Sequence, residues 1–151
     1  MENVWLGCSG WSYKEWIGAF YQEGERSMLV AYSRVFKTVE IDSTFYRYPN
    51  KGMVMGWLKY TKPDFIFTAK LPKLITHEKK LDLKRGLEND LEVFFELMRP
   101  LQLNGKLGCI LIQLPPKFGF DNLERLETFF QLLPAEFNFA VEFRDLSWMR
   151  D

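Results

Sequence analysis

Five short apolar runs of strand character alternate along this chain with four amphipathic helical patterns. Each helical pattern is long enough to return the chain to the edge where the previous strand began, so consecutive strands are expected to pair in parallel. The alternation predicts an α/β domain in which helices screen a parallel sheet. The predicted strands are Val4–Ser9, Thr38–Thr44, Phe65–Lys70, Leu107–Leu114 and Phe137–Arg144.

The helical patterns show apolar residues at helical spacing, and three of the four begin at residues that cap helices well, Ser27, Asn50 and Asp121. No linker, repeat or low-complexity stretch divides the chain, so we expect residues 1–151 to form a single domain. The predicted helices are Ser27–Phe36, a helix from Asn50 that ends before Pro63, a helix over about Leu81–Leu101, and a helix capped by Asp121 that ends before Pro134.

Polar side chains collect at the C-terminal ends of the predicted strands. In the second strand, Val39 and Ile41 alternate with Glu40 and Asp42, so the apolar and acidic pairs face opposite sides. Helices cover both faces of an open parallel sheet, whereas the mouth of a closed barrel collects inward-pointing groups from several strands. The pattern therefore favours a TIM (β/α)8-barrel-like fold, of which this chain would supply the first five strands and four helices. Its candidate site would lie at the C-terminal ends of the strands.

The residue types at these ends suit acid–base chemistry and the binding of a charged group. His77 is the one histidine of the chain, and it follows the third predicted strand. The alternative is a buried ion network with a loop histidine that only fixes its neighbours. The catalytic candidates are Glu40, His77 and Glu142. The substrate-binding candidates are Ser9, Trp11, Tyr13, Asp42, Lys70, Gln113 and Arg144.

The cofactor, if there is one, is not indicated by the sequence. Glu40, Asp42, Glu142 and His77 could supply ligands to a divalent metal, but they are dispersed and form no short ligand motif, so we do not favour a metal. Trp11 and Tyr13 belong to a crowd of aromatic residues after the first predicted strand. Exposed rings there would form a stacking platform, and buried rings would close the mouth of the barrel.

Charge and hydropathy narrow the classes of partner. Lys and Arg total 20 and Asp and Glu total 20, so no net charge favours a nucleic acid or an anionic membrane. No apolar run reaches the length of a membrane span, and the start at Met1 lacks a basic region followed by an apolar stretch. We therefore expect a cytoplasmic protein with no membrane association.

Several motifs in order along the chain resemble the YecE-like family, catalogued as domain of unknown function seventy-two. They are Gly7-Cys8-Ser9-Gly10-Trp11-Ser12-Tyr13 with Trp16, Gly18 and Phe20-Tyr21, then Thr38-Val39-Glu40-Ile41-Asp42-Ser43-Thr44-Phe45-Tyr46, Phe67-Thr68-Ala69-Lys70-x-Pro72, Ile75-Thr76-His77, Gln113-Leu114-Pro115-Pro116 and Val141-Glu142-Phe143-Arg144-Asp145-x-Ser147-Trp148. The family more often has Asn at the position of Asp42. The resemblance implies a TIM-barrel-like fold but no reaction, because the family has none established.

Our functional hypothesis is an enzyme of hydrolase or lyase type that acts on a small anionic or nucleotide-like substrate. The alternatives are a non-catalytic binding or scaffold protein and an inactive, truncated remnant of a barrel enzyme. A closed barrel takes about 250 residues, so the 151 residues here would leave the outer strands unpaired. We expect a homo-oligomer or a second chain to complete the barrel, and we do not expect the isolated chain to be a stable monomer.

Overall fold

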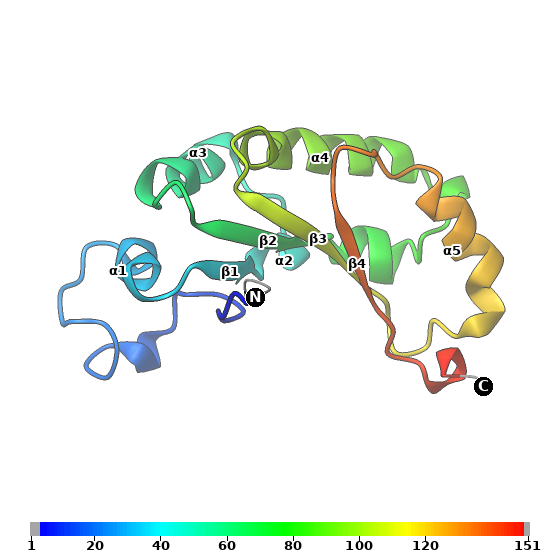
Figure 1. Ribbon diagram of the computed structural model, residues 1–151. Helices are drawn as coiled ribbons and strands as arrows, with labels where there is room; N and C mark the ends of the chain where they lie inside the picture. Colours follow the sequence, from blue (N-terminus) through cyan, green and yellow to red (C-terminus); the bar gives the residue numbers. More distant parts are fainter. Residues whose placement is uncertain (1–3, 150–151) are drawn as a thin grey trace.

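The computed structural model describes residues 4–149 and contains one sheet of four parallel strands in the order β1-β2-β3-β4 (Figure 1). The residues Met1 to Asn3, where the sequence predicts no leader, lie outside the described residues, as do the last two. No helix among residues 4–149 is long and apolar enough to span a membrane. The strands are β1 Thr38–Ile41, β2 Ile66–Lys70, β3 Leu107–Gln113 and β4 Phe139–Glu142.

The prediction of five strands is wrong, because residues 4–9 form no strand. This segment touches β1 through a single parallel bridge between Ser9 and Glu40. Its hydrogen bonds run from Glu40 N to Cys8 O at 3.0 Å and from Gly10 N to Glu40 O at 2.9 Å. The apolar side chains of Val4 and Leu6, ahead of the bridge, are largely exposed, at 89% and 75%. Only the end of the apolar run that meets β1 is therefore held in the sheet.

Four of the five α-helices match the predicted helical patterns. The caps Ser27 and Asn50 are confirmed, since Ser27 accepts from Val30 N at 3.4 Å and the Asn50 side chain accepts from Met53 N at 2.9 Å. Each such bond satisfies one of the free N–H groups of a helix start. The helices are α1 Met28–Val35, α2 Ser43–Tyr46, α3 Lys51–Tyr60, α4 Leu87–Leu103 and α5 Leu123–Phe130.

Two predicted helix starts are wrong. Asp121 does not cap a helix but lies in the 3-10 turn Phe120–Asn122, and α5 begins after it. α4 begins at Leu87 rather than near Leu81, because the backbone of Leu81 and Gly86 is left-handed, with φ of 56° and 68°. A left-handed residue interrupts the right-handed helical path, so the apolar spacing before Gly86 belongs to turns instead.

The short helix α2 replaces the end of the second predicted strand. Thr44 was expected to close that strand, but its Oγ1 lies 2.8 Å from the carbonyl oxygens of both Ile41 and Lys70. The hydroxyl thereby binds the backbone at the ends of β1 and β2, and the chain turns away from the sheet at Asp42. The fifth predicted strand is likewise shorter than expected, since β4 ends at Glu142.

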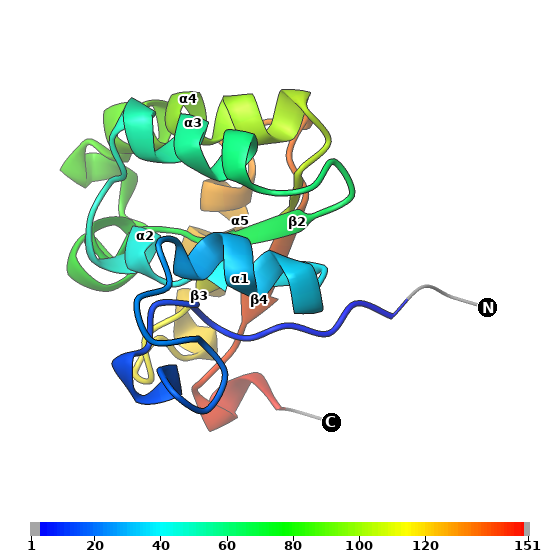
Figure 2. The same ribbon diagram turned by 90° about the vertical axis from the view of Figure 1, so that its left-hand side faces the viewer.

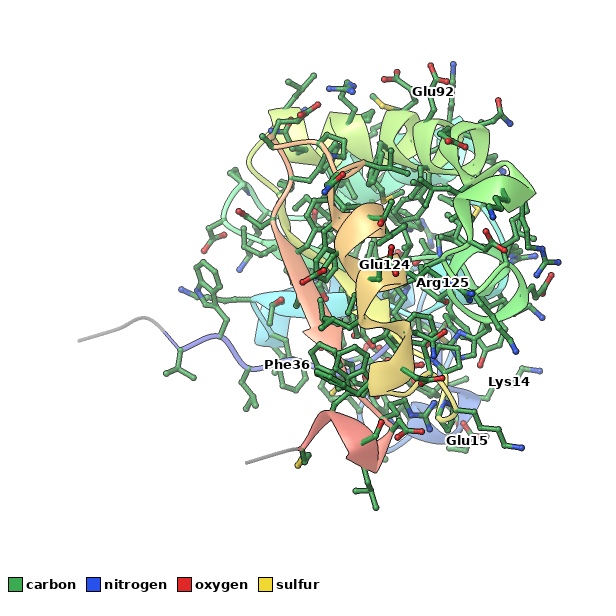
Figure 3. All side chains as sticks on the ribbon, turned by 90° about the vertical axis from the view of Figure 1, so that its right-hand side faces the viewer. Lys14, Glu15, Phe36, Glu92, Glu124 and Arg125 are labelled. Atoms are coloured by element: carbon green, nitrogen blue, oxygen red, sulfur yellow. The ribbon has the colours of Figure 1, made fainter. Side chains whose placement is uncertain are left out.

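The hydrophobic core lies between the sheet and the helices. Figure 1 shows α1, α3, α4 and α5 in an arc on the same side of the strands. The strand residues that face this side are buried, as are Val54 and Trp57 of α3 and most of the apolar stripe of α4. Charged side chains of α4 and α5, labelled Glu92, Glu124 and Arg125 in Figure 3, lie on the exposed outer surfaces of these helices. The core side of the sheet is made by Val39, Ile41, Phe67, Ala69, Ile110 and Ile112.

The opposite face of the sheet, here called the inner face, borders a hollow of about 560 Å³. At one edge of this face, the segment that carries Gly7 approaches the backbone of β1 closely. A Cβ on Gly7 would lie 2.0 Å from the carbonyl oxygen of Thr38, so only glycine fits where the first segment meets β1. The hollow is lined by Trp5, Gly7, Cys8, Ser9, Thr38, Val39, Glu40, Ile66, Thr68, Gly108 and Cys109.

Candidate functional site

The four strands bring a row of polar side chains to their C-terminal ends, which we call the rim. β1 contributes Glu40, and β2 contributes Lys70. Gln113 of β3 and Glu142 of β4 are paired in register. Figure 2 shows α2 and the segments that follow β2 on the same side of the molecule. Because parallel strands end at one edge of the sheet, residues far apart in the sequence meet there.

One corner of the rim is a closed ion network. The Lys70 ammonium lies 3.2 Å from Glu40 Oε1 and 3.0 Å from Asp42 Oδ1. Ser9 Oγ donates a hydrogen bond of 2.6 Å to the same Glu40 oxygen. We call Ser9, Glu40, Asp42 and Lys70 the Lys70 corner. The structure brings these four sequence candidates together, and the bonds leave the lysine only 15% exposed.

The charges in the Lys70 corner determine what it can bind. Burial alone would lower the pKa of Lys70, but hydrogen bonds from its ammonium to Asp42 and Glu40 outweigh burial and raise it. The lysine therefore stays protonated between two carboxylates, which leaves one excess negative charge on the three groups. An ammonium already bound to two carboxylates has less of its charge available for an anion, which bears on the substrate-binding role expected for Lys70.

The other corner, formed by Gln113, Glu142 and Arg144, is more open. Gln113 Nε2 donates to Glu142 Oε2 at 2.8 Å, which fixes the orientation of the carboxylate. Arg144 Nε lies 3.7 Å from Glu142 Oε1, and the arginine side chain is 42% exposed. A contact of this length between exposed groups is a weak ion pair. We call these three residues the Arg144 corner, and its guanidinium can still bind an anionic group.

His77 lies beside the rim on a single turn of π-helix, Leu74–Glu78. Its ring packs edge-on against Phe45 with ring centres 5.0 Å apart. The pKa of His77 is lowered, mainly by burial and further by the positive charges of Arg144 and Lys73. Both effects favour the neutral imidazole, the form that can accept a proton at neutral pH.

The partners of Thr76 indicate which nitrogen of His77 carries the proton. Thr76 Oγ1 lies 2.8 Å from His77 Nδ1 and donates to the carbonyl oxygen of Pro72 at 3.4 Å. A hydroxyl has one hydrogen, and a carbonyl oxygen can only accept, so both contacts are satisfied when Nδ1–H donates to Thr76. His77 Nε2 then holds the free lone pair and can act as a base.

Two contacts stabilise the irregular turn that carries His77. Lys79 forms a short ion pair with Asp90 of α4. Arg85 donates to the carbonyl oxygen of Glu78 at 2.5 Å. The backbone at Lys80 has a φ of 53°, which is uncommon for a residue other than glycine. Single π-turns and left-handed residues often occur at functional sites.

A smaller pocket of about 240 Å³ adjoins the Lys70 corner. Among the predicted residues, it brings Trp11 and Tyr13 next to Asp42. Tyr46, an exposed residue of α2, also lines it and was not predicted, because it follows the end of the predicted strand Thr38–Thr44. Of the other aromatic residues in this part of the chain, Tyr21 is buried and donates to the carbonyl oxygen of Trp11 at 2.5 Å. The aromatic segment thus provides both packing and a pocket wall.

The carboxylates of the rim and His77 do not gather into a metal centre within residues 4–149. In that part of the chain, no group of three or more His, Cys, Asp or Glu side chains is arranged to hold a metal ion. Glu40 and Asp42 instead share Lys70, and Glu142 is bound to Gln113.

Comparisons with known proteins give one consistent result. The YecE protein of Escherichia coli K12 is 34% identical over 141 residues, which are 93% of this chain and 48% of that protein. The YunF protein of Bacillus subtilis is 26% identical over 150 residues, with 96% of this chain and 52% of that protein covered. This chain therefore spans about half the length of the curated relatives it matches.

Solved structures agree with the sequence relatives. A crystal structure of a DUF72 family protein from Thermotoga maritima is 35% identical and superposes with a TM-score of 0.81, covering 97% of this chain and 58% of that one. Another, from Enterococcus faecalis, is 28% identical with a TM-score of 0.71, covering 81% and 49%. The family model described as protein of unknown function DUF72 matches residues 5–151, and the chain belongs to this family.

Proposed function

We propose that this chain forms part of a (β/α)8 barrel whose active site is at the rim. The strands follow one another in sequence order, and the long helices lie on one face. A doubly wound sheet would reverse its strand order and place helices on both faces. The hollow inner face would then be covered by further polypeptide, either from a longer chain or from a second copy.

The proposed reaction is a hydrolysis or an elimination on a small anionic or nucleotide-like substrate. The geometry that supports it is at His77, whose Nδ1 contacts Thr76 Oγ1 at 2.8 Å, so that Nε2 would accept the proton, and whose pKa is lowered first by burial and then by the charges of Arg144 and Lys73. Arg144 would bind the anionic group of the substrate, since its fork of N–H donors suits carboxylate or phosphate. His77 would then take a proton from water or from the substrate.

The carboxylates would have different roles in this scheme. Glu142 is the second acid–base candidate, because Gln113 orients it and Arg144 lies beside it. Glu40 is bound to both Ser9 and Lys70, so its role would be to shape the site together with Asp42. The cation that binds substrate would be Arg144 rather than Lys70.

The test is a screen of phosphorylated and carboxylated metabolites for turnover by the chain in its natural assembly. With a substrate identified, His77→Ala should lower kcat/KM by about 100-fold or more, as expected for loss of an acid–base catalyst. Arg144→Gln should mainly raise KM. Arg34→Gln on α1 is a matched control, since Arg34 is exposed and is not part of the rim. Unchanged turnover in His77→Ala would refute the proposed catalytic role.

The closed network around Lys70 favours a second candidate, a non-catalytic binding or scaffold protein. An ion network with little exposure of its cation is a common structural element. In this case Glu142→Gln and His77→Ala would change neither ligand binding nor any turnover, whereas Lys70→Met would affect folding alone. An inactive remnant of a barrel enzyme would give the same result in this chain, while its longer relatives would show turnover.

A further inference from the structure

We propose that the pocket next to Asp42 binds a small organic cation, in particular a methylated ammonium group. This inference goes beyond the proposed function, because it concerns a separate ligand group and is tested by binding alone. The pocket lies where the segment after residue 9 meets α2, and we call it the Tyr46 pocket. It is lined by Gly10, Trp11, Ser12, Tyr13, Asp42, Ser43 and Tyr46.

The charge of the pocket favours a cation. Among the described residues that line it, Asp42 is the only one with a charge. Its partner Lys70 does not line the pocket, and Lys70 is also bound to Glu40. The three groups together carry one excess negative charge. A cation in the pocket would neutralise this charge, whereas an anion would be repelled by the carboxylate it meets.

Three aromatic side chains line the same small space. Trp11 packs edge-on against Trp57 with ring centres 6.2 Å apart, and Tyr13 packs against Trp16 at 4.8 Å. No ring contact within residues 4–149 joins Tyr46 to Tyr13 or to Trp11 across the pocket. The space between rings beside a carboxylate is the arrangement that binds quaternary ammonium groups, whose charge is attracted to aromatic faces.

The wall that carries Tyr13 is fixed before any ligand arrives. The Tyr13 hydroxyl donates a short hydrogen bond to the carbonyl oxygen of Ser9. Gly10 has a φ of +83°, and a Cβ there would lie 2.9 Å from the Tyr13 hydroxyl. Only glycine therefore allows the tyrosine ring to fold back over the chain at this point. A preformed wall reduces the entropy lost when a ligand binds.

The size of the pocket limits what part of a ligand it takes. Its volume of about 240 Å³ is below the range of roughly 300–1,000 Å³ typical of sites that enclose a whole drug-sized molecule. A headgroup is therefore the expected occupant. A methylated ammonium makes the fullest use of the three rings, because its methyl groups carry part of the positive charge into contact with the aromatic faces.

The first experiment compares choline with its neutral carbon analogue, 3,3-dimethylbutan-1-ol, by isothermal titration calorimetry on the full chain. The two molecules have nearly the same shape and differ in charge. We expect choline to bind at least about tenfold more tightly than the alcohol, a ratio typical of a desolvated cation on aromatic rings. Equal affinities, or no binding of choline at millimolar concentration, would overturn the proposal.

Two variants locate the binding. Tyr46→Leu should weaken choline binding about tenfold, and Asp42→Asn should weaken choline binding without changing the affinity for the alcohol. Tyr60→Leu is the matched control, because Tyr60 is a similarly exposed tyrosine on α3 that does not line the pocket. Circular dichroism confirms that each variant is folded. Unchanged choline affinity in folded Tyr46→Leu would place the ligand elsewhere and refute the assignment.

Discussion

Two shielded lysines at opposite ends of the sheet have opposite kinds of partner. Lys106, which precedes β3 at the N-terminal end, is 6% exposed and donates to three oxygens without a charge: Leu58 O at 3.3 Å, Thr61 O at 2.8 Å and Thr61 Oγ1 at 2.9 Å. Lys70 at the C-terminal end of β2 is bound instead to two carboxylates. Both lysines are shielded from solvent, but only one lies in a cluster of charges.

The different partners of Lys106 and Lys70 show that the two ends of the sheet differ. Ionisable groups gather at the C-terminal end, whereas the buried lysine at the N-terminal end binds uncharged oxygens. Lys106 binds carbonyl oxygens near the end of α3, which have no partner within the helix. Burial lowers the pKa of Lys106, with a small opposing effect from Asp64, whereas the pKa of Lys70 is raised by its carboxylates despite burial. In barrel enzymes the N-terminal end of the strands serves stability and the C-terminal end serves chemistry.

The largest expected effect is that of Lys106→Met, which leaves the carbonyl oxygens around it without a donor. We expect the free energy of unfolding to fall by about 3 kcal/mol, the cost of leaving buried acceptors unsatisfied. Urea denaturation followed by circular dichroism measures it. Lys62→Met is the control, because Lys62 is exposed in the same connection between α3 and β2. If both variants lost the same small amount, Lys106 would have no structural role.

Lys70→Met should have a smaller effect, about 2 kcal/mol, because its partners Glu40 and Asp42 are partly solvated and can relax. The loss comes from leaving two carboxylates side by side without a cation. A second substitution, Glu40→Gln, removes that repulsion, so the double variant should regain part of the lost stability in the same urea measurement. A double variant less stable than Lys70→Met would show that repulsion is not the cause.

At alkaline pH the two lysines should change the free energy of unfolding in opposite directions. The raised pKa of Lys70 adds stability that is complete below its unfolded value of 10.5 and is lost as pH rises through the folded value. The lowered pKa of Lys106 has the opposite effect, so its contribution increases with pH up to 10.5. Above pH 10, stability should therefore fall less steeply in Lys70→Met than in the unchanged chain. An identical slope would contradict the raised pKa.

The smallest effect concerns His77, which can be followed by NMR titration as the one histidine of the chain. Its pKa should lie below the ordinary value of 6.5, because burial and then Arg144 and Lys73 oppose its protonation. Arg144→Gln should raise this pKa while changing the free energy of unfolding by less than about 0.5 kcal/mol, since the Arg144 ion pair is long and exposed. If the pKa of His77 did not change in Arg144→Gln, the charge of Arg144 would have no effect on His77.

The parts of the fold that the sequence predicts are those decided by local pattern. Ser27 and Asn50 mark two helix starts correctly because a cap is made within one turn of chain. The first apolar run failed as a strand because its pattern does not reveal whether a neighbour will cover it. Ser43–Tyr46 became a helix because a tertiary contact, from Thr44 to the end of β2, overrides the strand preference of Thr, Phe and Tyr.

The candidate site also has parts that the sequence pattern predicts and parts that it does not. The alternation in β1 indicates that Glu40 and Val39 face opposite sides, and the order of the strands brings Glu40 next to Lys70. The contacts of His77 could not be inferred, because its turn of π-helix depends on the side-chain contacts of Lys79 with Asp90 and of Arg85 with Glu78, which no periodic pattern predicts. That Lys70 is already bound by two carboxylates also depends on distances that no pattern contains.

The absence of a side chain at Gly7 has a consequence for the whole rim. A methyl group at this position would overlap the Thr38 carbonyl oxygen, which it would approach to 2.0 Å, so any substitution must push the first segment away from β1. Ser9 travels with that segment and would lose its hydrogen bond to Glu40. Gly7, which has no side chain to contribute to chemistry, therefore sets the distance between Ser9 and Glu40. We expect this glycine to tolerate substitution less well than the polar residues of the rim.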